Sequence, residues 1–430
     1  MLITGAIGSG KTSSAMYPIT RQLIAYKSSN LHEKLGMLIL DVKGNYIYQV
    51  ENYAKLYNRE KDIIPIQISG EFKYNPLDNT ALKPTVLANR LKTILLLFSP
   101  NNTESYWIDK SETVLAEAIK LCRLYNNGYV TFKEIHNLIT NHDYYSEKVN
   151  TLRNKFLKHK FNPDQSYDLL SALNFFEKEF YSLDSRTFNI LKSEITRITS
   201  CFVSDSDVLK TFCPEKSKNN FPGFQSIIES GKIVILNMNI NEYKNLSKII
   251  ATYLKLDFQT EVLRRLATNN TNIHPVAFIS DEYSEYVSAT DANFFSQSRE
   301  SKCINIVSTQ SYTSLLNALN NKYSVEVIVQ NLVNKLWFRS DDMFTIEDAQ
   351  KQLRKNRCRK NFKNHIRKCK GDILQLYHAF ITIKKFQYFR KYKYLYTTRL
   401  WIRYQFLFSK SKHIRMSVIY IWWQKNPSTN

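Results

Sequence analysis

Eight residues near the N-terminus have the types and spacing of a phosphate-binding loop. Residues 5–12 read Gly-Ala-Ile-Gly-Ser-Gly-Lys-Thr, which satisfies the pattern G-x-x-x-x-G-K-[ST] at every required position. Glycines let the backbone turn tightly, so that successive N–H groups point at phosphate oxygens. The Lys11 ammonium would reach the β- and γ-phosphates, and the Thr12 hydroxyl would hold Mg²⁺. We therefore expect nucleoside triphosphate to bind at Gly5, Gly8, Ser9, Gly10, Lys11 and Thr12.

Two adjacent acids follow an apolar run much later in the chain. Val276-Ala-Phe-Ile-Ser280 has the composition of a buried strand, and Asp281 and Glu282 come directly after it. At the carboxyl end of such a strand, Asp281 would bind Mg²⁺ through its water shell, and Glu282 would orient or deprotonate the attacking water. Acids after a strand are also common in ordinary turns. The phosphate-binding loop upstream favours the catalytic interpretation.

Strand and helix patterns alternate on both sides of these motifs. Apolar runs with the length and composition of buried strands occur at 2–4, 36–41, 63–68, 232–237, 276–280, 303–308 and 335–338. Helical patterns separate several of them, over 13–27, 45–58, 243–266 and 344–353. This alternation predicts the α/β class with a mainly parallel, twisted sheet, and it places the phosphate-binding loop at the first turn.

The segment between the third and fourth of these strands has a different pattern. Amphipathic helical patterns recur through residues 104–211, as at Val114, Ala118 and Leu121, with no strand-like run between them. We interpret this segment as an all-helical insertion that divides one α/β domain into two pieces. We predict a nucleotide-binding domain in two parts, residues 1–98 and residues 222–353. The all-helical insertion at 99–221 separates these parts, and a tail follows at 354–430.

Charge divides the chain near the same C-terminal boundary. The net charge is +22, but residues 351–430 hold 21 Lys and Arg against a single acid, Asp372, so the preceding residues are almost balanced. The tail also holds 16 aromatic residues, and no helix or strand period persists through it. Because the change near Leu353 is abrupt, we favour translation in a shifted reading frame. The alternative is a genuine nucleic-acid-binding tail, since basic and aromatic residues together suit a single-stranded platform.

The order of several motifs is similar to that of the type IV secretion coupling proteins of the TraG/TraD type, the DNA pumps of conjugation. The similar stretches are 5–12, Asp41–Gly44, Tyr74–Asp78, Tyr106–Asp109, Asp281–Glu282, Ser298–Arg299, Ser308–Ser311 and Leu336–Asp342. Together they span about residues 1–350. The resemblance implies a RecA-like P-loop nucleotide-binding domain, interrupted by an all-α domain, that hydrolyses ATP with Mg²⁺.

The resemblance also implies roles for two residues outside the loop and the acid pair. Arg299 matches the arginine finger of the family, which neutralises charge on the phosphoryl group of a neighbouring subunit. Gln310 matches a sensor of the γ-phosphate. With Glu282, these are the predicted catalytic residues, whereas Thr12 and Asp281 are the predicted metal ligands. The ordinary alternatives are a solvated surface arginine and a strand-end amide.

The function implied by the resemblance is an ATP-driven DNA translocase that delivers relaxase-bound DNA to a type IV secretion channel. Its partners would be single- or double-stranded DNA, relaxase and channel proteins, in a homohexamer at the inner, cytoplasmic face of the bacterial membrane. The helical insertion would choose the cargo. Two alternatives stay open: a FtsK- or HerA-like DNA motor, and a non-catalytic nucleotide-binding adaptor that recruits secretion substrates.

Two features depart from the family. Coupling proteins carry an N-terminal membrane anchor and a first strand that starts well before the phosphate-binding loop, whereas here the strand pattern begins at Leu2. We expect either a shortened open reading frame or a relative that docks on the membrane through a partner. Together with the basic tail, these departures predict a damaged copy that retains its site residues and aggregates when expressed alone.

Overall fold

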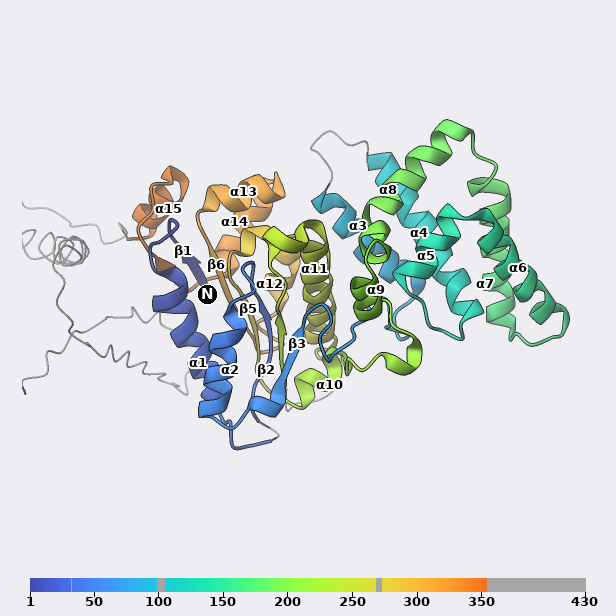
Figure 1. The fold of residues 1–430 in the computed structure, drawn as a ribbon. Helices are drawn as coiled ribbons and strands as arrows, with labels where there is room; N and C mark the ends of the chain where they lie inside the picture. The colour runs from blue at the N-terminus through green and yellow to red at the C-terminus, as the bar shows by residue number, and fades with distance from the viewer. Residues whose placement is uncertain (32, 99–104, 268–272, 354–430) are drawn as a thin grey trace, which may run out of the picture. The chain divides into compact units, whose positions relative to one another are not determined.

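The computed structural model describes residues 1–353, apart from residue 32 and the segments 99–104 and 268–272, so the predicted tail lies outside the described residues. A seven-stranded sheet has the order β3-β4-β2-β5-β6-β1-β7, and all neighbouring strands run parallel (Figure 1). The strands are β1 (Leu2–Thr4), β2 (Gly36–Leu40), β3 (Ile63–Ile66), β4 (Ile233–Leu236), β5 (Val276–Ser280), β6 (Cys303–Thr309) and β7 (Lys335–Trp337).

All seven predicted strands are present, with ends within two residues of the predicted ones, and the α/β class with a parallel sheet is confirmed. Every residue of β2 and β5 is buried, because helices cover both faces of a parallel sheet and its central strands need apolar side chains on both sides. Pro65 lies in β3, which is an edge strand. An edge strand tolerates the missing N–H of proline.

Helices cover the two faces of the sheet in separate layers. One face packs against the π-helical turn Thr12–Met16, α1 (Tyr17–Ala25) and α2 (Tyr46–Leu56). The other face packs against a second set of helices, which are α10 (Gly223–Glu229), α11 (Ile240–Arg264), α12 (Asp291–Gln297), α13 (Tyr312–Leu319) and α14 (Lys322–Asn331). After β7 the chain forms α15 (Met343–Leu353).

Between β3 and β4, the described residues form helices and turns and no strand. After α3 (Pro84–Leu97) come the helices of what we call the helical lobe: α4 (Ser105–Tyr125), α5 (Phe132–Thr140), α6 (His142–Leu157), α7 (Pro163–Asn174), α8 (Ser185–Val203) and α9 (Ser206–Phe212). A capping box begins α5, in which the side chains of Thr131 and Glu134 bond each other's backbone N–H. The predicted domain boundaries near residues 98 and 221 remain predictions.

Helix α11 joins the sheet to these helices. Its middle is buried on all sides, which its mixed sequence does not indicate. Asp257 on α11 forms a buried 2.7 Å ion pair with Arg90 of α3, and the Arg90 guanidinium also donates to Thr260. No helix in the described part of the chain is both long and apolar enough to cross a bilayer.

Candidate nucleotide-binding site

The phosphate-binding loop connects β1 to the helix on one face of the sheet, as predicted. Gly8 and Gly10 have φ of 74° and 95°, a region that favours glycine, and Lys11 is the N-cap of the helical turn that begins at Thr12. Gly5 is required for another reason, because a Cβ there would lie 2.5 Å from the Cβ of Phe338. Glycines at these positions, followed directly by the N-terminal end of a helix, make a loop that suits a phosphate.

Lys11 is buried and turns back over the loop. Its Nζ donates to the carbonyl of Gly5 at 2.7 Å and lies 3.5 Å from the carbonyl of Ala6. The same nitrogen lies 3.7 Å from Oε1 of Glu282. The loop lysine and the predicted catalytic acid, 271 positions apart in the sequence, therefore lie at one place.

Asp281 follows β5 and meets the loop directly. Its Oδ2 accepts a hydrogen bond of 2.9 Å from the Thr12 hydroxyl, and its Oδ1 accepts from the Ser308 hydroxyl and from the Glu282 N–H. A hydroxyl beside a carboxylate is the hard oxygen donor set that Mg²⁺ prefers, and Mg²⁺ binds through few protein ligands and keeps several waters. The donor set of Thr12 and Asp281 fits the predicted metal site.

Glu282 has the properties that a water-activating carboxylate needs. Its backbone adopts the left-handed conformation (φ 46°), its side chain is 15% exposed, and its Oε2 accepts no hydrogen bond from the described residues. Burial raises the pKa of this carboxyl, the positive charge of Lys11 lowers it in part, and the charge of Asp281 raises it further. A carboxylate with a raised pKa and a free oxygen can accept a proton from water.

The two residues assigned through the family resemblance lie at opposite ends of β6. Gln310 follows its carboxyl end, where its carbonyl accepts from the Gly5 N–H at 3.2 Å and its side-chain amide contacts Glu282. Arg299 precedes its amino end and is exposed. Since β6 has seven residues, Arg299 lies about 20 Å from the loop. The site of this chain therefore brings together Gln310 and the acids but not Arg299.

Structures of the bacterial conjugative coupling protein TrwB are similar to this chain. The unbound monoclinic form of TrwBdeltaN70 matches with a TM-score of 0.52 and 13% identity, over 82% of this chain and 72% of that one. TrwB in complex with the non-hydrolysable GTP analogue GDPNP matches with a TM-score of 0.52 and 13% identity, over 82% and 73%. This chain has the coupling-protein fold. No protein-family model and no curated protein sequence matches it.

Two residues that the sequence did not single out as site residues lie near Asp281. Ser308 bonds Asp281, because β5 and β6 are neighbours whose carboxyl ends meet. Asp41 after β2 is buried, and its carboxylate accepts from the N–H groups of Lys43, Asn45 and Tyr46. Burial raises the pKa of Asp41, and these three hydrogen bonds partly oppose the shift. Asp41 thus holds the turn between β2 and α2.

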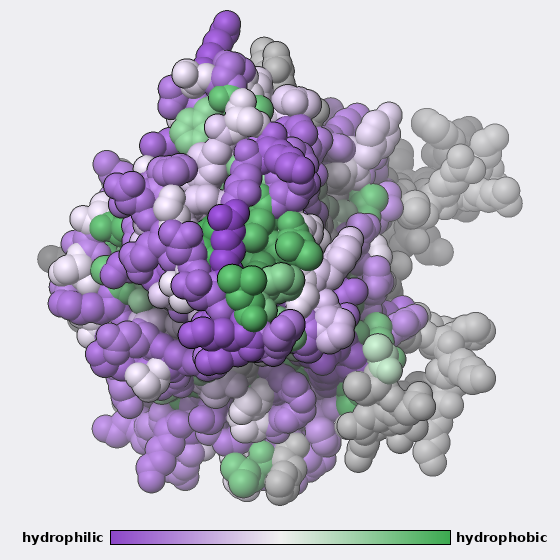
Figure 2. Space-filling model, turned by 90° about the vertical axis from the view of Figure 1, so that its right-hand side faces the viewer, coloured by the Kyte–Doolittle hydropathy of each residue, from purple (hydrophilic) through white to green (hydrophobic). Residues whose placement is uncertain are grey.

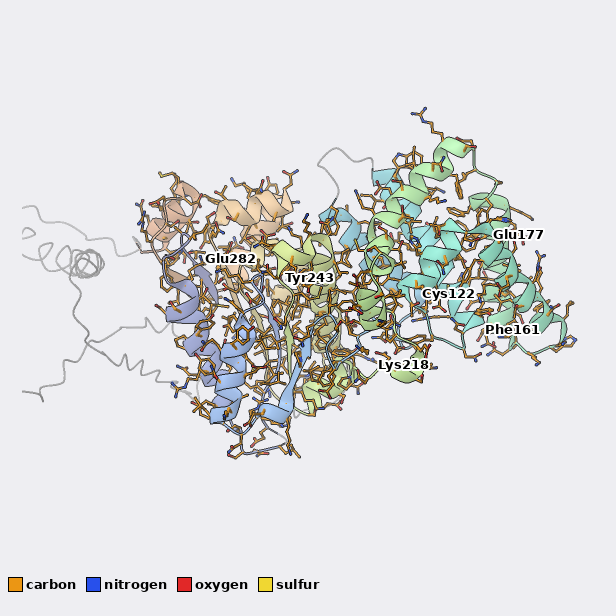
Figure 3. The ribbon with its side chains drawn as sticks, in the orientation of Figure 1. Cys122, Phe161, Glu177, Lys218, Tyr243 and Glu282 are labelled. Carbon is orange, nitrogen blue, oxygen red and sulfur yellow. The ribbon has the colours of Figure 1, made fainter. Side chains whose placement is uncertain are left out.

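A buried ion pair holds the turn that carries Glu282. Lys255 of α11 and Asp291 of α12 are both fully buried, with 2.6 Å between Nζ and Oδ2. Lys255 also donates to the carbonyl of Tyr286, and the same carboxylate accepts from the hydroxyl of Tyr283, the residue after Glu282. A lysine in a helical pattern normally predicts an exposed position, so the sequence carried no signal for this pair. Figure 3 places Glu282 by the sheet, far from Cys122 of the helical lobe and from Glu177, which lies between α7 and α8.

Proposed function

We propose that this chain is an ATPase that translocates DNA and acts as a coupling protein, delivering relaxase-bound DNA to a type IV secretion channel. The observation that carries the proposal is the convergence of Lys11, Thr12, Asp281 and Glu282 at one end of a parallel sheet. Lys11 would bind the β- and γ-phosphates, and Glu282 would orient and deprotonate the attacking water. Mg²⁺, held by Thr12 and Asp281, would neutralise charge on the phosphates.

ATP binding and turnover by the purified chain test the enzymatic part. Lys11→Ala removes the phosphate contact and should abolish binding. Glu282→Gln keeps the shape of the side chain but removes the base, so it should bind ATP normally and lose turnover. Glu285→Gln is the matched control, because Glu285 lies three residues further on, is 40% exposed and pairs with Lys248. Wild-type turnover by Glu282→Gln would contradict the assignment.

The proposal that Arg299 acts on the nucleotide of a neighbouring subunit rests on its exposure and on its distance from the pocket of its own chain. Lys11→Ala and Arg299→Ala should each be inactive alone. A mixture of the two should regain part of the turnover, because some interfaces then combine an intact pocket from one chain with an intact arginine from the other. If the mixture regained no ATP turnover, the proposal that Arg299 acts between subunits of a homohexamer would be wrong.

The proposal that this chain moves DNA is based on the fold that it shares with TrwB, which is a bacterial conjugative coupling protein. Phosphate contacts would dominate binding, so affinity for single- or double-stranded DNA should fall steeply with salt and depend little on sequence. Turnover of ATP should rise on adding DNA, and the chain should displace a third strand from a triplex. ATP turnover with no response to DNA would instead favour an adaptor. We place this activity in the cytoplasm, at the inner face of the bacterial membrane.

We further propose that the helical lobe selects the cargo. Figure 2 shows an apolar patch in the middle of one face, surrounded by hydrophilic residues, on the side where Figure 1 places α6 and α7. On these helices Leu157 and Leu170 are 72% and 55% exposed. Contiguous exposed apolar patches commonly mark interaction sites. Leu157→Asp with Leu170→Asp should reduce relaxase capture at unchanged ATP affinity, whereas Leu56→Asp, an exposed leucine of α2, should change neither.

A further inference from the structure

The phosphate-binding loop is held from both flanks at its first two residues. Strand β1 lies between β6 and β7. The N–H of Gly5 donates to the carbonyl of Gln310, which follows β6, and the N–H of Ala6 donates to the carbonyl of Arg339, which follows β7, at 2.7 Å. Neighbouring strands lie about 4.8 Å apart, so Arg339 adjoins the loop as closely as Gln310 does.

The two flanks differ in the charged groups that lie beside the loop. On the β6 flank lie Gln310 and, beyond it at the end of β5, the carboxylates of Asp281 and Glu282. On the β7 flank lies the Arg339 side chain, which is 61% exposed and forms a loose 3.5 Å ion pair with Asp341, itself 77% exposed. A solvent-exposed ion pair of this kind contributes little to stability, so the guanidinium can exchange Asp341 for a ligand at little cost.

The position of the acids sets the direction of a bound nucleotide. Lys11 meets Glu282 on the β6 flank, so the γ-phosphate must lie there, within reach of the group that activates water. The loop itself surrounds the β-phosphate. The α-phosphate and the nucleoside must then extend from the loop away from the acids, which is toward the β7 flank and Arg339.

From this geometry we infer that Arg339 forms a subsite, within the same chain, for the nucleoside end of the bound nucleotide. Its guanidinium bonds the α-phosphate and covers the face of the base, since arginine pairs with phosphate in a forked geometry and stacks on aromatic rings. This inference rests on the proposed ATP-binding function and deepens it. Arg339 and Arg299 thus have different roles: Arg339 binds the nucleotide of its own chain, whereas Arg299 is proposed to act on the next one.

The subsite has a kinetic consequence that separates it from the catalytic groups. The nucleoside end does not change during phosphoryl transfer, so a contact there stabilises ground state and transition state equally. Loss of the contact raises KM and leaves kcat unchanged. Affinity for ADP falls by the same factor as affinity for an ATP analogue, since both carry the same nucleoside and α-phosphate. We expect a factor of about ten for one charge-assisted contact.

The test compares Arg339→Ala, Arg339→Lys and wild type by titration calorimetry with Mg²⁺–ADP and with a non-hydrolysable ATP analogue. Arg339→Ala should weaken both ligands about tenfold, and Arg339→Lys should restore part of the loss. The matched control is Arg186→Ala, an exposed arginine at the start of α8 in the helical lobe. It should change neither affinity. Because the Arg339 side chain is exposed, its removal should leave the fold intact, which circular dichroism checks.

Two results would overturn the inference while leaving the proposed function in place. One is wild-type affinity of Arg339→Ala for both ligands, measured beside a Lys11→Ala variant that binds neither. The other is weakening for the ATP analogue alone, which would place Arg339 at the γ-phosphate. Failure of the wild-type chain to bind either ligand would refute the proposed function itself, and the subsite with it.

Discussion

Two ion pairs join α11 to the segment that follows Glu282, and they differ in burial and in the number of further hydrogen bonds to the charged groups. Lys255 and Asp291 lie 2.6 Å apart with both side chains 0% exposed. Lys248 and Glu285 also lie 2.6 Å apart, but their side chains are 35% and 40% exposed. A comparison of the two pairs therefore measures how much more it costs to remove a charge from a buried, hydrogen-bonded pair than from an exposed one.

The perturbation is replacement of each lysine by methionine, an unbranched side chain one heavy atom shorter, which removes the charge. Lys255→Met leaves the Asp291 carboxylate buried without its countercharge, although Gln259, the Tyr283 hydroxyl and the Ser288 N–H still donate to it. Breaking a buried pair in this way costs about 3–5 kcal/mol of unfolding free energy. Lys248→Met leaves a carboxylate that water solvates, so its cost is about 0.2–1 kcal/mol.

Urea unfolding followed by far-UV circular dichroism measures both losses of unfolding free energy. The comparison holds if the slope of the unfolding free energy against urea concentration is the same for each variant. Asp291→Leu and the double variant with Lys255→Met complete a mutant cycle. The double variant should lose about 1–3 kcal/mol less unfolding free energy than the sum of the two single variants. The reason is that the double variant leaves no unpaired charge behind. If Lys255→Met cost no more than Lys248→Met, the reasoning from burial would be wrong.

Three further predictions follow from single residues. Because burial raises the pKa of Glu282 in the free chain, its carboxylate is protonated at a higher pH than an ordinary glutamate, and kcat/KM for Mg²⁺–ATP should begin to fall above the usual glutamate pKa of about 4.3 as pH is lowered; an acid limb at the ordinary value would contradict this. Gly5→Ala places a Cβ 2.5 Å from the Cβ of Phe338, so Mg²⁺–ATP should no longer raise the melting temperature. Thr131→Ala removes the capping box of α5 and should cost about 1 kcal/mol in urea unfolding without changing ATP affinity, whereas no loss of stability would show that the cap is dispensable.

Much of the fold could be predicted from the sequence because its signals are local. The central strands are continuous apolar runs. Because a strand buried on both faces has no polar positions within it, the ends of the run mark the ends of the strand. The phosphate-binding loop and the pair Asp281–Glu282 are likewise contiguous in the chain. The buried state of Lys255 could not be predicted, because its helix lies between the sheet and other helices and its charge is balanced by Asp291, a partner 36 residues away.

What the sequence by itself determined is the identity of the groups that would do chemistry and the strands that carry them. The tertiary structure alone decided which groups meet. Strand order places β6 between β1 and β5, so Ser308 and Gln310 join the acids, and it places β7 on the other side of β1, so Arg339 adjoins the loop. The reason is physical: a motif depends on covalent spacing, whereas the order and register of parallel strands depend on how helices pack on both faces of the whole sheet.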